Sequence, residues 1–292
     1  MTILTVVLAL LAALGNAAAS VLQRRGTTLV DDGGLDVARW WSWAARLIHR
    51  RVWLWGAGLL ALSGLCQAAA LAAGPLAVVQ PVMTTELLFT MVIGSVVFRR
   101  RPDVRTRWAF VAMAVGLAAF MALLSPSGGG STVPGSRWLW WGVGLAALTL
   151  LLTASAWRLP PAPAAAVLGT ATAIGFACTA ALVKDAVGRL PDGVGALATA
   201  WQSYAAVLVG LGSFLLLQLT LRAGPLVASQ PAMTLGDAFL SVLLGSVLFG
   251  EELSLGLRLL PQVLALALLI AGTVQLARSP LLTSSDGQER PW

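Results

Sequence analysis

A long motif occurs twice in this chain. Residues 74–84 read GPLAVVQPVMT, and residues 224–234 read GPLVASQPAMT. A second shared block follows each copy, GSVVF at 94–98 and GSVLF at 245–249, so the offset changes from 150 to 151 residues between the blocks. Because both copies lie in very apolar sequence, the duplication predicts a membrane protein of two related halves with a solute site between them.

The composition provides too little polar surface to cover a water-soluble globule. Of the 292 residues, 11% are charged, whereas soluble domains have roughly 25%. The net charge of +7 does not indicate nucleic-acid binding, because the basic residues flank apolar stretches. Cys66, Cys178 and His49 cannot supply a metal or haem site of familiar spacing. We therefore expect no cofactor, and the sequence contains no nucleophile–base set that would predict an enzyme.

Apolar stretches long enough to cross a bilayer recur along the whole chain. A span needs about 20 apolar residues. Some neighbouring stretches are separated only by Gly, Pro and a few other residues, which predicts tight helical hairpins. We predict an all-α polytopic membrane protein with nine spans, near 3–22, 53–73, 76–98, 108–124, 138–157, 164–184, 196–219, 226–249 and 259–277.

Three polar segments interrupt this pattern. Residues 36–51 place Trp and apolar side chains on one helical face and Arg on another, which is typical of a helix lying in the membrane surface; a plain Trp-rich loop is the alternative. Residues 125–136 have the composition of a flexible linker, and 279–292 that of a disordered cytoplasmic tail. The predicted units are a first repeat at 1–124, a linker with a connector helix at 125–157, and a second repeat at 158–278.

Basic residues predict the orientation in the membrane. With nine spans, 15 of them fall on one side and 4 on the other, and the side richer in Lys and Arg faces the cytoplasm. The N-terminus is then outside and the C-terminus cytoplasmic, in a bacterial-type inner membrane. The four on the outer side are Arg137, Lys184, Arg189 and Arg258.

The repeat extends to the first span of each half. ALGNAAASVLQR at 13–24 aligns with AIGFACTAALVK at 173–184, at an offset of 160. Spans 1 to 4 then match spans 6 to 9, and span 5 is a connector. Because matching spans are five apart, an odd number, the two halves must be inverted relative to each other. This 4+1+4 plan is that of many secondary transporters.

The arrangement resembles the drug/metabolite transporter (EamA-like) superfamily over roughly residues 10–275. Gly250-Glu251 matches its Gly-Glu signature, whereas the first half has Phe98-Arg99-Arg100-Arg101 in its place. The chain is most similar to the NIPA-type magnesium-transporter-like branch, through SVLQRRG after span 1, Lys184 after span 6 and Gln218 before the second hairpin. That branch has Pro-Leu-Gly where this chain has PVM at 81–83. The resemblance implies transport, with magnesium as one substrate.

Two acids define the main candidate site. Glu86 lies in the third span, and Asp237 lies at the matching position of the eighth. Carboxyls at membrane depth are costly, so they could bind a cation or carry protons; neutral carboxyls that bond a neighbouring helix are the alternative. The prolines of the repeat could free backbone groups for a solute, or merely kink the helices. These paired candidates are Gln80, Pro81, Thr84, Gln230, Pro231 and Thr234.

Other polar residues are weaker candidates for the solute pathway. Amides often only tie helices together, at about 1 kcal/mol or less each. We interpret Lys184, the single lysine, as an anchor that reaches the membrane surface. A cavity for an organic solute would be lined by Trp201 and Tyr204. The weaker candidates are Asn16, Gln67, Gln202, Tyr204, Gln218 and Lys184.

The function that these patterns favour is secondary transport of a small solute by alternating access. A divalent-cation transporter, with Glu86 and Asp237 as ligands, is the first alternative. A non-transporting scaffold or accessory subunit that binds anionic lipid is the second. The expected partners are the solute or cation, coupled protons and membrane lipid, with no nucleic acid; a homodimer is compatible with the plan.

Overall fold

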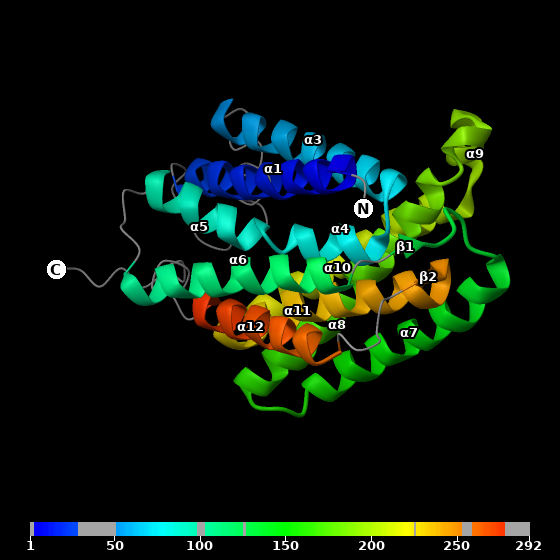
Figure 1. Cartoon of the computed structure of the whole chain (residues 1–292). Helices are drawn as coiled ribbons and strands as arrows, with labels where there is room; N and C mark the ends of the chain where they lie inside the picture. Colours follow the sequence, from blue (N-terminus) through cyan, green and yellow to red (C-terminus); the bar gives the residue numbers. More distant parts are fainter. Residues whose placement is uncertain are drawn as a thin grey trace.

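The computed structural model describes residues 3–28, 51–97, 103–124, 127–224, 226–252 and 259–277, and these are almost entirely α-helical (Figure 1). Two short strands, β1 (Ser127–Gly128) and β2 (Glu251–Glu252), pair antiparallel, and a short 3₁₀ helix, η1, spans Leu190–Asp192. The helices are α1 (Ile3–Thr28), α3 (Arg51–Ala73), α4 (Leu76–Met83), α5 (Glu86–Val97), α6 (Val104–Leu124), α7 (Gly135–Ala156), α8 (Pro161–Val187), α9 (Val194–Thr199), α10 (Trp201–Ala223), α11 (Leu226–Phe249) and α12 (Leu259–Ala277).

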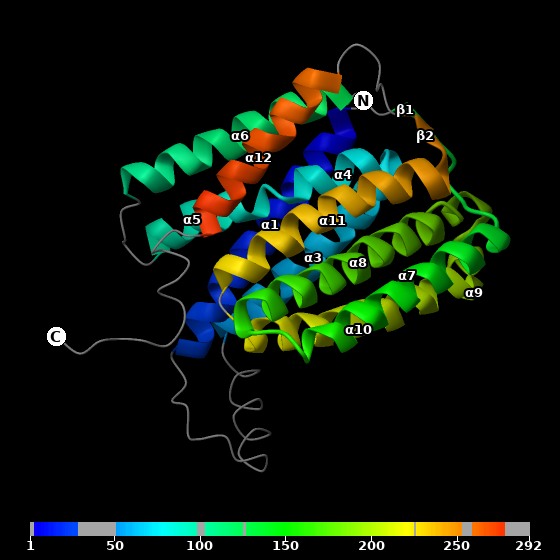
Figure 2. The same cartoon turned by 90° about the horizontal axis from the view of Figure 1, so that it is seen from below.

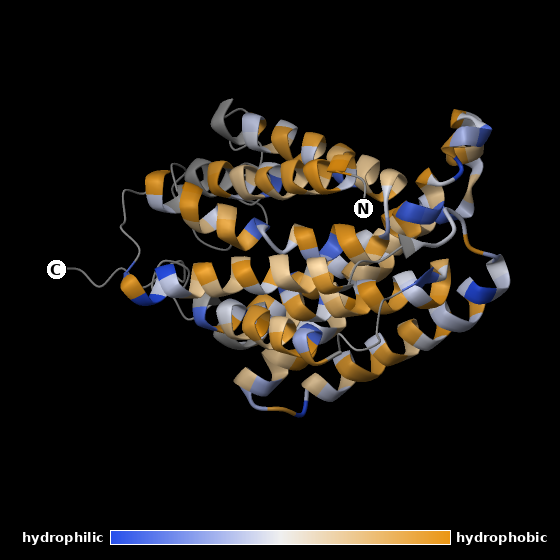
Figure 3. Ribbon diagram, in the orientation of Figure 1, coloured by the Kyte–Doolittle hydropathy of each residue, from blue (hydrophilic) through white to orange (hydrophobic). Residues whose placement is uncertain are grey.

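The chain is an all-α, multi-pass membrane protein. Within the described residues, seven helical segments are long and apolar enough to cross a membrane, and a shorter apolar helix covers Leu260–Gln275. Apolar residues run along the helices, and most hydrophilic residues lie at helix ends and in connections (Figure 3). The seven segments are Ile3–Leu22, Leu54–Ala73, Leu76–Val97, Gly135–Ala156, Pro161–Asp192, Trp201–Ala223 and Pro231–Phe249.

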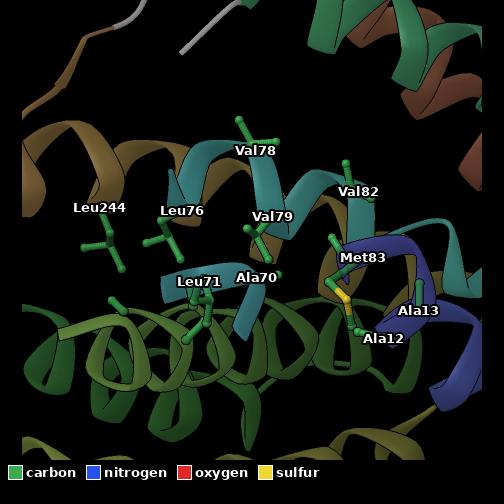
Figure 4. Packing of buried hydrophobic residues seen from close by; sticks show 14 of the residues in the cluster. Ala12, Ala13, Ala70, Leu71, Leu76, Val78, Val79, Val82, Met83 and Leu244 are labelled. Carbon is green, nitrogen blue, oxygen red and sulfur yellow. The ribbon is translucent and has the colours of Figure 1, made fainter. Parts of the chain in front are cut away.

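The helices expose large apolar side chains, as expected when lipid replaces water as solvent. On α7, Trp140 is 80% exposed and Leu150 is 71% exposed. In the core, by contrast, apolar helices are covered by other helices, and α4 is buried along its whole length. Its side chains pack with Leu71, Leu244 and alanines of α1 in the core (Figure 4).

Small residues let helix pairs approach closely within each half. α1 packs along α3, and α8 packs along α10 and α11. A Cβ added to Gly15 of α1 would meet Ser63 of α3, and a Cβ added to Gly175 of α8 would meet Ser213 of α10. In a membrane, where lipid is as apolar as the helices, such close van der Waals packing is a main source of helix association.

The crossing of α6 and α12 is reciprocal. A Cβ on Gly116 of α6 would meet the backbone of Leu269 on α12, and a Cβ on Gly272 of α12 would meet the backbone of Met113 on α6. The separation in sequence is the same between the two glycines as between the two partners. The two helices run in opposite directions side by side (Figure 2). Corresponding positions of the two helices therefore meet at this crossing.

The structure changes several predicted boundaries. The stretch predicted at 76–98 is two helices, α4 and α5, separated at Thr84 and Thr85. The stretch predicted to begin at 196 begins at Trp201, because Ala200 is extended and separates α10 from α9. The prediction of a free linker at 125–136 is wrong for the described part, because β1 pairs with β2 and the Gly130 N–H donates to Phe249 O at 2.7 Å.

Two predicted segments fall outside the described residues. These are the amphipathic helix at 36–51, apart from Arg51 at the start of α3, and the tail at 279–292. Nine spans and the 4+1+4 order stay predictions.

The α6–α12 crossing gives a test of the packing. The Gly116→Ala variant should lose about 1–3 kcal/mol of the free energy of unfolding, because its methyl group would push against the Leu269 backbone. Gly142→Ala on α7 is the matched control, since its Cβ would meet nothing within 4 Å, and it should be neutral or stabilising by up to about 1 kcal/mol. Denaturation of the purified protein in detergent measures both, and equal effects would contradict a close crossing.

Candidate functional site

The third predicted span is broken next to the first candidate acid. α4 ends at Met83 and α5 begins at Glu86. Within the break, the hydroxyl of Thr84 donates to Pro81 O at 2.6 Å, and the hydroxyl of Thr85 donates to Val82 O at 2.7 Å. These carbonyls are therefore satisfied by the chain's own threonines, and they are not left free for a solute.

The break coincides with the one-residue change of offset in the repeat. The first half reads PVMTTE from Pro81, and the second reads PAMTLGD from Pro231, so the first half is one residue shorter. Removing a residue from a continuous helix would rotate everything after it by about 100°. The turn at Thr84 and Thr85 interrupts the helix, so the orientation of α5 is not fixed by the helical rotation of α4. α11 continues without a break from Leu226 to Phe249.

Glu86 is held by α1. The Asn16 Nδ2 donates to Glu86 Oε2 at 3.2 Å. The hydroxyl of Ser63, on α3, lies 2.7 Å from Asn16 Oδ1 and 2.6 Å from Ala12 O, so it fixes the amide in turn. The carboxyl, the amide and the hydroxyl form a short polar chain across three helices of the first half.

Asp237 has different surroundings at the matching position of α11. Its Oδ1 is buried and accepts no hydrogen bond from the described residues. Ser241, one turn along α11, approaches the carboxyl without hydrogen-bond geometry. Cys178 of α8 lies close enough for the charge of Asp237 to act on its thiol. The repeat places Phe176 where the first half has Asn16, so the amide partner is missing here.

The paired candidates near the acids differ in burial. Gln80 and Pro81 are buried in α4, and Thr84 is buried in the break. Pro231 is buried within α11, and Thr234 is half-buried one turn later. The Gln230 side chain lies outside the described part of the structure. The structure thus keeps the two Gln-Pro motifs in helices, but only the first is followed by a break.

Most of the weaker candidates do not converge on the acids. Gln218 is exposed on α10, and Tyr204 is 63% exposed with its hydroxyl donating to Ala198 O at 2.8 Å. Trp201 is 49% exposed, so the prediction that Trp201 and Tyr204 line a cavity is wrong in this state. Gln67 is half-buried on α3. An alternation of apolar and polar residues cannot show which helical face meets lipid when the whole helix is apolar.

The Lys184 side chain points into the protein and not out of it. It is buried, and its Nζ lies 2.7 Å from Glu251 Oε1 and 3.0 Å from Gly74 O, with the Phe249 ring centroid 4.9 Å away. The interpretation of Lys184 as a surface anchor is therefore wrong, because Glu251 provides a buried counter-ion 67 residues further along the chain. The Gly-Glu signature was the only sequence signal for this partner.

Glu251 also completes the first turn of α4. Its Oε1 accepts from the Leu76 N–H at 2.6 Å, and its Oε2 accepts from the Ala77 N–H at 2.9 Å. The first N–H groups of a helix have no partner within the helix and favour a negative charge. One carboxylate from β2 therefore fixes the α3–α4 turn of the other half, beside Lys184.

Asp185, the next residue of α8, anchors a second set of elements. It accepts from Val133 N at 3.2 Å, from Trp138 Nε1 at 2.7 Å and from Gln202 Nε2 at 3.1 Å. Gln202 therefore ties α10 to α8, as expected of an amide between helices. Asp185 was not singled out from the sequence, where it reads as an ordinary loop acid after a span.

An apolar cavity of about 280 Å³ lies beside the break. Thr85 is the single polar residue among those that line it, and Val82 and Leu88 flank the break on either side. The remaining lining residues come from α1, α4 and α6: Val6, Leu10, Val78, Ala114, Leu117 and Ala118. Its lining suits an aliphatic group and not a hydrated ion.

The buried ion pair gives a test by substitution. Lys184→Met should lose about 3–5 kcal/mol of the free energy of unfolding, because it leaves the Glu251 carboxylate buried without its counter-ion. Arg189→Met is the matched control: the Arg189 side chain is 33% exposed and lies 3.6 Å from Asp185, a contact worth about 1 kcal/mol or less. Denaturation in detergent compares the two, and similar losses would contradict the role given to Lys184.

Comparison with known proteins finds a relative that matches most of the chain. No protein-family model matches the chain, and no solved structure matches it. A protein of Corynebacterium glutamicum, described as uncharacterized, is 29% identical over 246 residues, which cover 80% of this chain and 82% of that protein. The chain is thus similar to another protein over most of the length of both.

Proposed function

We propose that the protein is a secondary transporter that moves a small solute by alternating access between two inverted repeats of four spans, with α7 as the connector. In this proposal α4 and α5 together form the third span, so the chain crosses the membrane nine times. The proposal includes membership of the drug/metabolite transporter superfamily near its NIPA-type branch. It also places the protein in the cytoplasmic membrane with the N-terminus outside.

The observation that carries the proposal is the matching of contacts between the halves. The contact of Gly15 with Ser63 and that of Gly175 with Ser213 join residues that the repeat aligns, at offsets of 160 and 150. At the crossing of α6 and α12, Gly116 meets Leu269 and Gly272 meets Met113. Such a symmetric pair of contacts is expected where a twofold axis passes between the fourth and ninth spans. Matched helices such as α1 and α8 run in opposite directions (Figure 2). These features support inverted repeats, whose interface is the usual place of a transport site.

The contacts between the halves also suggest what must change during transport. α4 packs on α11, and Glu251 with Lys184 joins the second half to the α3–α4 turn of the first. In an alternating-access cycle this contact is closed in one state and separated in the other. Two discrete arrangements of a packed interface are the usual basis of such transitions.

The position of the acids favours an organic solute over a divalent cation. Glu86 is bonded to Asn16 on α1, whereas Asp237 lies by Cys178 on α8, so each acid faces the first helix of its own half. Among the described residues, no three His, Cys, Asp or Glu side chains gather as metal ligands. A magnesium site would need both acids to converge in another state. The apolar cavity beside the break supports a solute with an aliphatic part.

The test is transport by the purified protein in vesicles. A screen of cations, amino acids and amphiphilic amines under an imposed pH gradient should find one class that accumulates. Uptake should then fall at least about tenfold in Asp237→Asn and in Glu86→Gln, because each variant removes a carboxyl at membrane depth. Asp192→Asn, at an exposed acid outside the helical core, is the control and should transport normally. Accumulation of no solute under any gradient would contradict the proposal.

A further inference from the structure

The two repeat-related acids differ in how they are satisfied. Glu86 has an amide donor in Asn16, and Ser63 holds that amide in place. The buried Oδ1 of Asp237 has no donor among the described residues. Bilayers contain no water that could take over this role, so an unsatisfied carboxyl in a span requires a specific explanation.

Ser241 has an unbonded hydroxyl at the same place. Several buried threonines and serines within helices donate to the carbonyl four residues earlier, as Thr172, Ser213 and Thr273 do, whereas Ser229 and Ser241 of α11 do not. Ser241 is completely buried, yet its Oγ makes no such bond and has no other partner among the described residues. Its hydroxyl is therefore available to the carboxyl of Asp237, one turn away.

No cationic side chain of the helices packed on α11 is free to balance a charge on Asp237. α4 and α12 contain no titratable residue. α8 contributes Cys178, close enough for the charge of Asp237 to act on its thiol, and Lys184, whose Nζ donates to Glu251 and Gly74. α10 contributes Tyr204 and Arg222, which are both exposed. Among the described elements packed on α11, the acids are Asp185 of α8, which accepts from Val133, Trp138 and Gln202, Glu251 of β2, which is bound by Lys184, and Glu252 of β2, which is exposed.

We propose that Asp237 is the exchangeable proton-binding residue of the transporter, that Ser241 is its hydrogen-bonding partner, and that Glu86 keeps a fixed, structural bond to Asn16. A buried acid without a counter-ion is stable only when an exchangeable cation neutralises it. A hard metal cation requires about six oxygen ligands, whereas among the described residues no three His, Cys, Asp or Glu side chains gather near this carboxyl. A proton requires only the carboxyl itself. The inference rests on the proposed function, because it names the coupling ion.

The test uses N,N′-dicyclohexylcarbodiimide on the full-length protein in detergent and in vesicles, with the labelled residue read by mass spectrometry. This reagent takes up the proton of a neutral carboxyl while the carboxylate oxygen adds to its central carbon, and it partitions into apolar surroundings. Labelling is expected at Asp237 several-fold above Glu86, and it should decrease as the pH is raised. Sodium or magnesium ions should not protect the site at constant pH.

Variants separate the role of each residue. Glu86→Gln should keep the labelling at Asp237, and Asp237→Asn should lose it. Asp237→Glu keeps the carboxyl and should be labelled, which guards against a loss caused by misfolding. Ser241→Ala should shift the pH at which labelling is half-maximal, while the proportion of folded protein stays unchanged. Labelling mainly at Glu86, or protection by sodium at constant pH, would overturn the proposal.

The assay needs no transported solute, so its outcome is independent of the transport screen. Absence of labelling at Asp237 in a protein that transports would overturn the proton assignment alone. Pronounced labelling at Asp237 in a protein that moves no solute would support the proton site and count against the transporter.

Discussion

The absence of water from the bilayer interior is the constraint on which this structure depends. Every polar group in a span must find its partner inside the protein. The bond of Lys184 to Glu251 meets this requirement for several groups at once, because the same carboxylate accepts from Leu76 N and Ala77 N while the ammonium donates to Gly74 O. The end of α3, the start of α4, the last turn of α8 and β2 are thereby fixed at one point.

The same constraint explains the differences between the two halves. In the first half, the helix breaks after Pro81, and Thr84 and Thr85 satisfy the carbonyls at the break. In the second half, the helix continues through Pro231. The acid that follows is bonded to Asn16 in the first half and lacks an amide partner in the second. Two copies of one motif can therefore have different functions. The residue missing from the first half accompanies the break between α4 and α5, and the change from Asn16 to Phe176 removes the amide partner of the acid in the second half.

The sequence allowed good prediction of the helices and poor prediction of the site. The apolar stretch predicted to end at 249 gave the end of α11, and Gly74-Pro75 gave the turn between α3 and α4. The prediction that Lys184 lies at the membrane surface was wrong, since its counter-ion, Glu251, is distant in sequence and lies in a connection between helices. The segment at 125–136 has the composition of a linker, yet β1 and its glycines pack against Phe249 and β2, because backbone pairing does not depend on composition.

By itself, the sequence determined that the chain is helical, resides in a membrane and is built from a repeated unit, because hydrophobic length and internal similarity are local properties. Only the tertiary structure decided which polar residues meet. Glu251 with Lys184, Asn16 with Glu86, and Gln202 with Asp185 all join different elements. In helices that are apolar on every face, periodicity does not distinguish the side that meets lipid from the side that meets protein. That choice depends on how closely small residues such as Gly116 and Gly272 allow helices to approach.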